Sequence, residues 1–226
     1  EERDQNKSFE LYDELTFLNS QLSNFNTMLI GSGKIYNVVN KYFVDKEKKY
    51  DFYHAERDLD FAYRNGKQVR FHSLLVKDDY GLFNGKSKDE ILYIIKEYVK
   101  SSIDFINKFN ENHKIMINGK EEPVINAVDL FNEIVSFDKM IFDKDTNKWY
   151  EYKRINNEYK VVIDEDKGMY RDLKDGEIPE YQNIWYVKYG IEMDELMDCF
   201  QYALENKSEG ISYLYNEPFL EDEERR

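Results

Sequence analysis

One stretch constrains the fold of this chain more than any other, a short apolar run that ends in an amide and a carboxylate. It spans residues 127–133, with the sequence AVDLFNE. Runs of this length that are rich in Val, Leu and Phe are typical of buried strands in a parallel sheet. Polar residues where such a strand emerges stand where (β/α) enzymes keep their chemistry. Glu133 is therefore a candidate catalytic acid and Asn132 a candidate substrate-binding amide, unless the carboxylate only caps the next element.

Charge and composition exclude several classes of function. The 226 residues include 32 Lys and Arg against 46 Asp and Glu, which gives a formal net charge of −14. An acidic surface repels phosphate backbones, so nucleic acid is not an expected partner. No apolar stretch approaches the roughly 20 residues that cross a membrane, so no membrane partner is expected either. The length fits one large domain or two small ones, and we expect a single domain over residues 1–226.

The chemistry-bearing residues indicate an enzyme or a binding protein without a metal or cofactor. Cys199 is the one cysteine, which excludes an intrachain disulfide, and a helical pattern around it predicts an inert buried thiol. The three histidines show no metal-ligand spacing. Aromatic residues are abundant, with 19 Tyr and 15 Phe. They build cores, and they also offer flat platforms for sugars.

Segments with helical periodicity alternate with short apolar runs along the chain. A capping box at Ser87 and Glu90 begins one helix, and Asn65-Gly66 ends another. A glycine-containing turn at residues 31–33 follows the first strand, and it lacks the longer pattern of a phosphate-binding loop. Helices are predicted over 9–25, 51–65, 87–109 and 192–205, with a helix or helical turn over 35–43; strands over 27–30, 68–75, 124–131 and 211–215; and a hairpin over 114–123.

Residues 136–190 differ from the rest and are interpreted as an insertion after the central strand. Alternating aromatic residues at 149–153 and 159–163 flank Asn156-Asn157, a pattern that indicates a β-hairpin. Insertions at this end of a (β/α) fold often shape binding clefts. The aromatic tip is either such a surface or packing against the body.

Three predicted strands carry polar residues at their ends: His72, Asn132-Glu133 and Asn216-Glu217. Strand and helix alternation implies parallel strands joined by right-handed crossovers, so these ends meet at one edge. A lone histidine is more often a structural hydrogen-bonding group than a catalyst. The grouping of three such strand ends is what favours a functional site.

This order of motifs resembles the family-ten glycoside hydrolases, endo-β-1,4-xylanases with a (β/α)8 barrel. Residues 52–72 (FYHAERDLDFAYRNGKQVRFH) resemble a stretch of that family that ends in an Arg-Gly-His-Thr-Leu strand. AVDLFNE resembles its Trp-Asp-Val-Val-Asn-Glu strand, and residues 213–222 (YLYNEPFLED) resemble its Leu-Tyr-Tyr-Asn-Asp-Tyr strand. The resemblance covers roughly residues 25–222, weakly within the insertion. It implies an incomplete TIM-type α/β barrel with about strands two to five of eight.

The resemblance also implies roles for individual residues. Glu133 would be the general acid that protonates the leaving oxygen and then the base that activates water. Asn132 and His72 would bind the sugar at the cleavage point, with Asn216 beside the acid/base. Lys34 matches a substrate-binding lysine of the family. The implied partner is a β-linked, xylan-like oligo- or polysaccharide, and the implied location is extracellular.

The chain departs from the family pattern at several positions. The family's Glu-Asn pair falls on Gly31-Ser32, its Trp falls on Val76, and the Asp of its fifth-strand pair is Glu217. Retaining hydrolysis also needs a second carboxylate, which the family places on its seventh strand, and these 226 residues contain no such motif. Glu217 is the only carboxylate of this chain that we consider as a replacement for the nucleophile. Another chain or segment is expected to complete the barrel.

Three functions therefore remain open at the level of sequence. The first is a xylanase-like glycosidase that uses Glu133. The second is a relative that binds a glycan without cleaving it, which the departures at Gly31-Ser32 and Val76 favour. The third is an interaction scaffold whose aromatic hairpin binds protein and needs no sugar.

Overall fold

The fold is built on a parallel β-sheet. In this computed structural model, the structure describes residues 25–39, 50–77, 79–132 and 134–216. The strand order β1-β2-β6-β11 follows the chain, every pairing is parallel, and β3 also pairs with β6. The strands are β1 (Thr27–Ile30), β2 (Gln68–Phe71), β3 (Leu75–Val76), β6 (Ile125–Asn132) and β11 (Ser212–Asn216).

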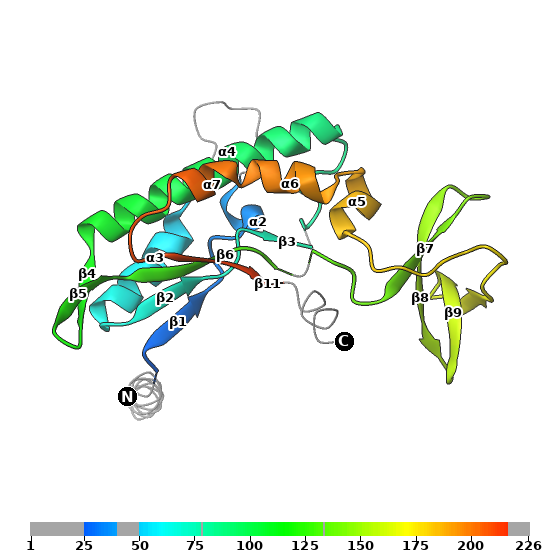
Figure 1. Cartoon of the computed structure of the whole chain (residues 1–226), viewed down its shortest axis with the longest axis horizontal. Helices are drawn as coiled ribbons and strands as arrows, with labels where there is room; N and C mark the ends of the chain where they lie inside the picture. The colour runs from blue at the N-terminus through cyan, green and yellow to red at the C-terminus, as the bar shows by residue number, and fades with distance from the viewer. Residues whose placement is uncertain (1–24, 40–49, 78, 133, 217–226) are drawn as a thin grey trace, which may run out of the picture.

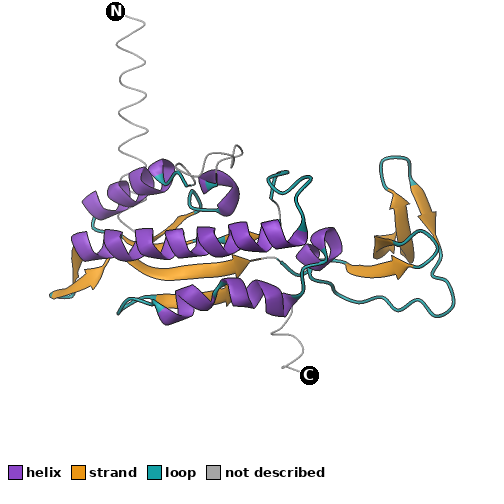
Figure 2. Cartoon of the chain, turned by 90° about the horizontal axis from the view of Figure 1, so that it is seen from above, coloured by secondary structure: helices purple, strands orange, loops and turns teal. Residues whose placement is uncertain are grey.

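Helices connect these strands and cover one face of the sheet (Figures 1 and 2). Apolar side chains from the strands and helices meet between the two layers and form one continuous core. On the opposite face Leu29 is 61% exposed, as in an unclosed segment of a barrel. The helices are α2 (Ile35–Val38), α3 (Tyr53–Arg64), α4 (Lys88–Asn112), α5 (Ile184–Tyr189), α6 (Met193–Cys199) and α7 (Gln201–Glu205). No helix of the described part of the chain is long and apolar enough to cross a bilayer.

Helix α4 is the long element that spans the sheet (Figure 1). It begins with the predicted capping box, in which the Ser87 hydroxyl accepts from the Glu90 N–H and Glu90 accepts from the Ser87 N–H. Its buried side includes Ile91, Ile95 and Tyr98, spaced three or four residues apart. The Tyr98 hydroxyl lies 3.2 Å from the carbonyl oxygen of Leu74, which ties the helix to the segment after β2.

The insertion forms an antiparallel sheet beyond the carboxyl end of β6 (Figure 1). The predicted hairpin is confirmed as β8 and β9, and its turn residues Asn156 and Asn157 have φ of 49° and 70°, as the tight hairpin turn requires. The outer strands were not predicted from sequence. The sheet order is β10-β9-β8-β7, with β7 (Lys139–Asp143), β8 (Lys148–Ile155), β9 (Glu158–Asp164) and β10 (Met169–Arg171). A smaller predicted hairpin, β4 (Lys114–Ile117) with β5 (Lys120–Pro123), is also confirmed.

Several predicted elements are shorter than the sequence pattern indicated. The strand over 68–75 is interrupted between Phe71 and Leu75, and the helix over 192–205 is divided at Phe200. Phe200 is fully buried, with its ring 5.9 Å from that of Phe131, so packing against the sheet overrides helix periodicity there. Of the helix or helical turn predicted over 35–43, the structure has the short helix α2, which ends at Val38 because Val39 adopts an extended backbone. The helix over 9–25 lies outside the described residues.

The interruption after β2 has a clear hydrogen-bonding cause. The His72 N–H donates to the Ile30 carbonyl at 2.8 Å, on the β1 side, whereas the Leu74 N–H donates to the Asp129 carbonyl at 2.9 Å, on the β6 side. The backbone therefore changes its hydrogen-bonding strand from β1 to β6 within three residues. The side chain of His72 contacts the Asp129 carboxylate of β6 at this bend.

Candidate functional site

The candidate site is organised around Asp129, a fully buried carboxylate in the middle of β6. Val128 and Leu130 on either side of it belong to the core. Residues two apart on a strand share a face, so Asp129 points away from the helix-covered side. A buried charge is costly unless it is paired and hydrogen-bonded. Asp129 therefore requires cationic or donor partners from the neighbouring strand.

The end of β2 supplies these partners. The Arg70 guanidinium approaches the carboxylate with Nε 2.9 Å from Oδ1 and 3.0 Å from Oδ2, and one terminal nitrogen lies 2.9 Å from Oδ1. His72 Nδ1 lies 2.6 Å from Oδ2 of the same group. Charge-assisted contacts of this kind fix both side chains. Arg70 and His72 are thus held side by side at the carboxyl end of the sheet.

Asp129 also determines which ring nitrogen of His72 is left as a hydrogen-bond acceptor. A carboxylate only accepts hydrogen bonds, so Nδ1 of His72 carries the hydrogen and the neutral ring has its lone pair on Nε2. That atom lies 3.4 Å from Nδ2 of Asn132 at the end of β6. The His72 side chain remains 20% exposed. The arrangement presents an imidazole acceptor and an amide together, two groups suited to binding hydroxyls.

The structure brings together some of the residues predicted from sequence. His72 and Asn132 meet directly, and Asn216 at the end of β11 pairs with Asn132 in the strand register. Lys34 is the N-cap residue of α2, after the turn at residues 31–33, and Gly31 lies between its side chain and the His72 backbone. A Cβ placed on Gly31 would stand 3.8 Å from Lys34 Nζ and 3.5 Å from the His72 carbonyl oxygen.

Two predicted site residues lie outside the described part of the chain. They are Glu133, the candidate acid/base, and Glu217 after β11. Their assigned roles therefore stay predictions. The side chain of Asn216 is likewise not described, although its backbone is placed in β11.

Sequence reasoning missed Arg70 and Asp129, the ion pair that positions the site. The signal was present, because each is a charged residue inside an otherwise apolar predicted strand, in QVRF and AVDLF. Charged residues are rarely fully buried unless paired. Each of these two residues therefore signals that it needs a partner, but the sequence does not say which strand supplies that partner.

Other reactive groups do not contribute to this site. Among the described residues, no group of three or more His, Cys, Asp or Glu side chains could hold a metal ion. Burial raises the pKa of the Cys199 thiol to about 11. The thiol is therefore protonated at neutral pH and does not act as a nucleophile.

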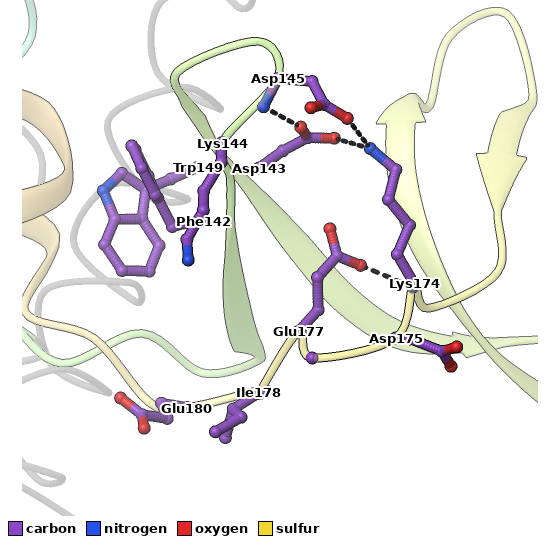
Figure 3. Close-up of a pocket in the computed structure, with 11 residues that line it drawn as sticks. Phe142, Asp143, Lys144, Asp145, Trp149, Lys174, Asp175, Glu177, Ile178 and Glu180 are labelled. Carbon is purple, nitrogen blue, oxygen red and sulfur yellow. Dashed lines mark hydrogen bonds and ion pairs between the residues drawn. The ribbon is translucent and has the colours of Figure 1, made fainter.

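A second polar cluster lies in the antiparallel sheet, beside a hollow of about 460 Å³ (Figure 3). Asp143 at the end of β7 accepts from Arg171 at 2.9 Å and from Lys174 at 3.1 Å. Arg171 also forms a two-point contact with Glu177, at 2.6 and 2.8 Å. These groups engage one another, so the cluster anchors residues 171–177 to β7.

Comparisons with known proteins agree with the partial barrel. The sequence matches no protein-family model and no curated protein. Among solved structures, the chain is similar to the N-terminal endo-1,4-beta-D-xylanase 10B of Clostridium thermocellum, complexed with xylohexaose, with a TM-score of 0.51 and 16% identity. The match covers 85% of this chain and 33% of that one. Xylanase 10B from Thermotoga petrophila, with xylobiose, and native xylanase 10B from Thermotoga maritima each give a TM-score of 0.47, with 17% and 18% identity, over 84% of this chain and 41% of theirs.

At these identities the similarity concerns the fold. The chain spans about a third to two fifths of the length of these xylanases. It therefore has a partial, unclosed (β/α) barrel fold of the kind found in family-ten glycoside hydrolases.

Proposed function

We propose that the His72–Asn132 edge of the sheet binds a β-linked, xylan-like saccharide as part of a glycoside hydrolase. The supporting observation is the meeting of His72 and Asn132 at the carboxyl ends of two neighbouring parallel strands, with His72 oriented by buried Asp129. This is the edge at which (β/α) barrels carry their active sites. The imidazole and the amide bind sugar hydroxyls.

In this proposal Glu133, next in sequence to Asn132, transfers the protons. As an acid it protonates the glycosidic oxygen of the leaving group, and as a base it then activates water. A raised pKa suits both steps. Retaining cleavage also requires a second carboxylate about 5–5.5 Å from the first. We assign that carboxylate to a further segment or a second chain that covers the open face of the sheet. Within these 226 residues, Glu217 is the alternative candidate for the nucleophile.

The proposal extends to the setting in which the protein acts. A xylan-like polysaccharide is a plant polymer, too large to enter a cell intact. The proposed location is therefore extracellular.

A relative that binds saccharide without cleaving it is the second candidate. Val76, which falls where the resembling family has a Trp, is buried in the short strand β3 and offers no hydrogen-bonding group. Gly31 likewise lacks the side chain of the carboxylate that it replaces. Fewer direct side-chain contacts to the sugar are therefore available at the proposed cleavage point than in the resembling family.

Glu133→Gln separates the two candidates. Binding of xylohexaose by calorimetry and hydrolysis of xylohexaose by product analysis are measured for the wild type and the variant. For a hydrolase, the variant keeps binding and loses cleavage, because the amide retains the shape of the side chain but supplies no proton. Binding without cleavage by the wild type supports the second candidate. Unchanged turnover in the variant contradicts the role of Glu133, and a wild type that binds no saccharide contradicts both.

A further inference from the structure

The antiparallel sheet carries an exposed aromatic hollow that the proposed site does not use. Its volume is about 300 Å³, and we call it the aromatic groove. Tyr159 is 61% exposed, Phe137 48% and Tyr181 46%. Exposed aromatic side chains that gather on one surface mark binding sites more often than scattered ones do. The lining residues are Phe137, Asp138, Lys139, Tyr152, Tyr159, Pro179 and Tyr181.

The geometry of the rings suits a flat, amphipathic ligand. Tyr152 and Tyr159 stack with centroids 5.4 Å apart and planes 28° from parallel, so Tyr152 supports the more exposed ring of Tyr159. A tyrosine offers an apolar face together with a hydroxyl that donates and accepts hydrogen bonds. The ring of a neutral sugar has the matching surface, with C–H groups on its faces and hydroxyls at its edge.

The charge of the groove also favours a neutral ligand. Asp138 and Lys139 are the charged residues of its lining, and their charges cancel. The chain as a whole carries −14. An acidic surface of that size repels polyanions, so an anionic polymer is not expected to bind here. A lining of tyrosine and phenylalanine rings without net charge is suited to an uncharged polymer.

The wall of the groove that carries Pro179 and Tyr181 is held in place before any ligand binds. Glu180, between them, exchanges two backbone hydrogen bonds with Met140 of β7, at 2.6 and 3.1 Å. The contacts of Arg171 with Asp143 and Glu177 anchor the segment just before this wall. A rigid wall lowers the entropy cost of binding.

The groove begins at the edge of the parallel sheet that carries the proposed sugar site. Phe137 is five residues after Asn132, and its ring lies 4.0 Å from Nζ of Lys77, the residue directly after β3. The antiparallel sheet stands beyond the carboxyl end of β6 (Figure 1). A polymer held at His72 and Asn132 can therefore continue toward the groove.

We propose that the aromatic groove binds further units of the same uncharged β-linked polysaccharide chain, away from the His72–Asn132 position. This inference rests on the proposed function. The groove extends the contact with long chains and makes none with short ones, so affinity rises with the length of the oligosaccharide.

The test compares calorimetric binding of xylobiose and xylohexaose by the full chain. The groove variants are Tyr159→Ala and Tyr181→Ala, and the matched control is Tyr93→Ala, an exposed tyrosine on α4. His72→Ala serves as the reference for the proposed site. The wild type and the control should bind xylohexaose at least about tenfold more tightly than xylobiose, a difference of about 1.4 kcal/mol. Each groove variant should lose most of that difference and keep its affinity for xylobiose.

The outcomes separate the two proposals. If both groove variants keep the full preference for xylohexaose while His72→Ala weakens binding of either sugar, the groove proposal is overturned and the proposed function stands. If neither sugar binds the wild type, both are overturned. Aromatic grooves also bind proline-rich peptides. Binding of a proline-rich peptide that both groove variants abolish, with xylohexaose affinity equal in all proteins, overturns the sugar assignment of the groove.

Discussion

At the residue scale, the candidate site is organised by one carboxylate that has no contact with solvent. Asp129 is fully buried, and it both pairs with Arg70 and orients His72. Removing one partner of a buried pair leaves the other without compensation. Stability and the proposed saccharide binding therefore depend on the same side chain.

Asp129→Asn should reduce both stability and saccharide binding. The amide cannot neutralise Arg70, and we expect a loss of about 1–3 kcal/mol in the free energy of unfolding, less than for a fully buried partner because Arg70 is partly exposed to solvent. Affinity for xylohexaose should also fall, because His72 loses its orienting acceptor. Urea unfolding and calorimetry measure the two effects. Asp60→Asn, which breaks an exposed pair with Arg64 on α3, is the control and should change neither. Equal stability of Asp129→Asn and wild type would contradict the account.

Gly33→Ala tests the close approach of the first turn to β2. A Cβ at this position would stand 2.0 Å from the ring of Phe71, which is fully buried and has no room to move. Overpacking of this kind costs about 1–3 kcal/mol. Gly31→Ala is the matched control, since its Cβ would meet no atom closer than 3.4 Å. Thermal unfolding should show a clear loss for the first variant and little for the second. Similar losses for both would mean that the turn adjusts freely.

Sequence reasoning located His72 and Asn132 at strand ends, and the structure places them together. It did not find the Arg70–Asp129 pair. The reason is physical: periodicity identifies which face of a strand is apolar, but the pairing of two charges depends on the register between β2 and β6. That register includes a shift next to Arg70, which no local pattern encodes.

At the element scale, α4 is the helix whose boundaries follow most directly from local chemistry. Its capping box satisfies N–H groups that would otherwise lack partners at the first turn. The predicted start at Ser87 is confirmed. Where local chemistry is weaker, tertiary contacts decide, as at Phe200, where packing on Phe131 divides the predicted helix into α6 and α7.

Ser87→Ala should destabilise the protein by about 1 kcal/mol, the usual cost of removing an N-cap side chain. The Ser87 hydroxyl accepts from the Glu90 N–H at 3.3 Å, and alanine leaves that group unpaired. Ser101→Ala in the middle of the same helix is the control, because alanine favours helix interiors. Denaturant midpoints compare the two variants. A loss in Ser101→Ala as large as that in Ser87→Ala would argue against a capping effect.

At the scale of the whole molecule, two sheets of different kinds meet at one edge. The sequence predicts the parallel sheet because each of its strands follows a helix, and it predicts the β8–β9 hairpin because of its turn. It does not predict β7 and β10. The segments of these two strands are short, so their local pattern is weak. The ion cluster of Asp143, Arg171 and Glu177 also joins residues up to 34 positions apart in the chain, which no local pattern reveals.

The stability of the antiparallel sheet should depend on pH between about 4 and 2. Burial opposes ionisation of Asp143, but hydrogen bonds from Lys174, from two backbone N–H groups and from Arg171 outweigh it and lower the pKa from 3.8 to about 2. A lowered pKa in the folded state means that stabilisation is complete above 3.8 and is lost as the pH falls toward 2.

Thermal unfolding followed by tryptophan fluorescence between pH 5 and 2 measures this effect. Asp143→Asn should be less stable than wild type at pH 5, and the difference should shrink toward pH 2. Asp175→Asn, in the same loop and exposed, is the control and should follow the wild-type curve. A constant difference between Asp143→Asn and wild type across this range would contradict the assignment.

The central claim is that Nε2 of His72 faces a bound sugar. Nitrogen-15 NMR of the imidazole rings during titration with xylohexaose tests it most directly, with His54 and His113 as internal references. We predict that the hydrogen of neutral His72 resides on Nδ1 and that its Nε2 resonance shifts on addition of the saccharide, while the rings of His54 and His113 do not respond. Saccharide binding that leaves the His72 ring unchanged would contradict the account.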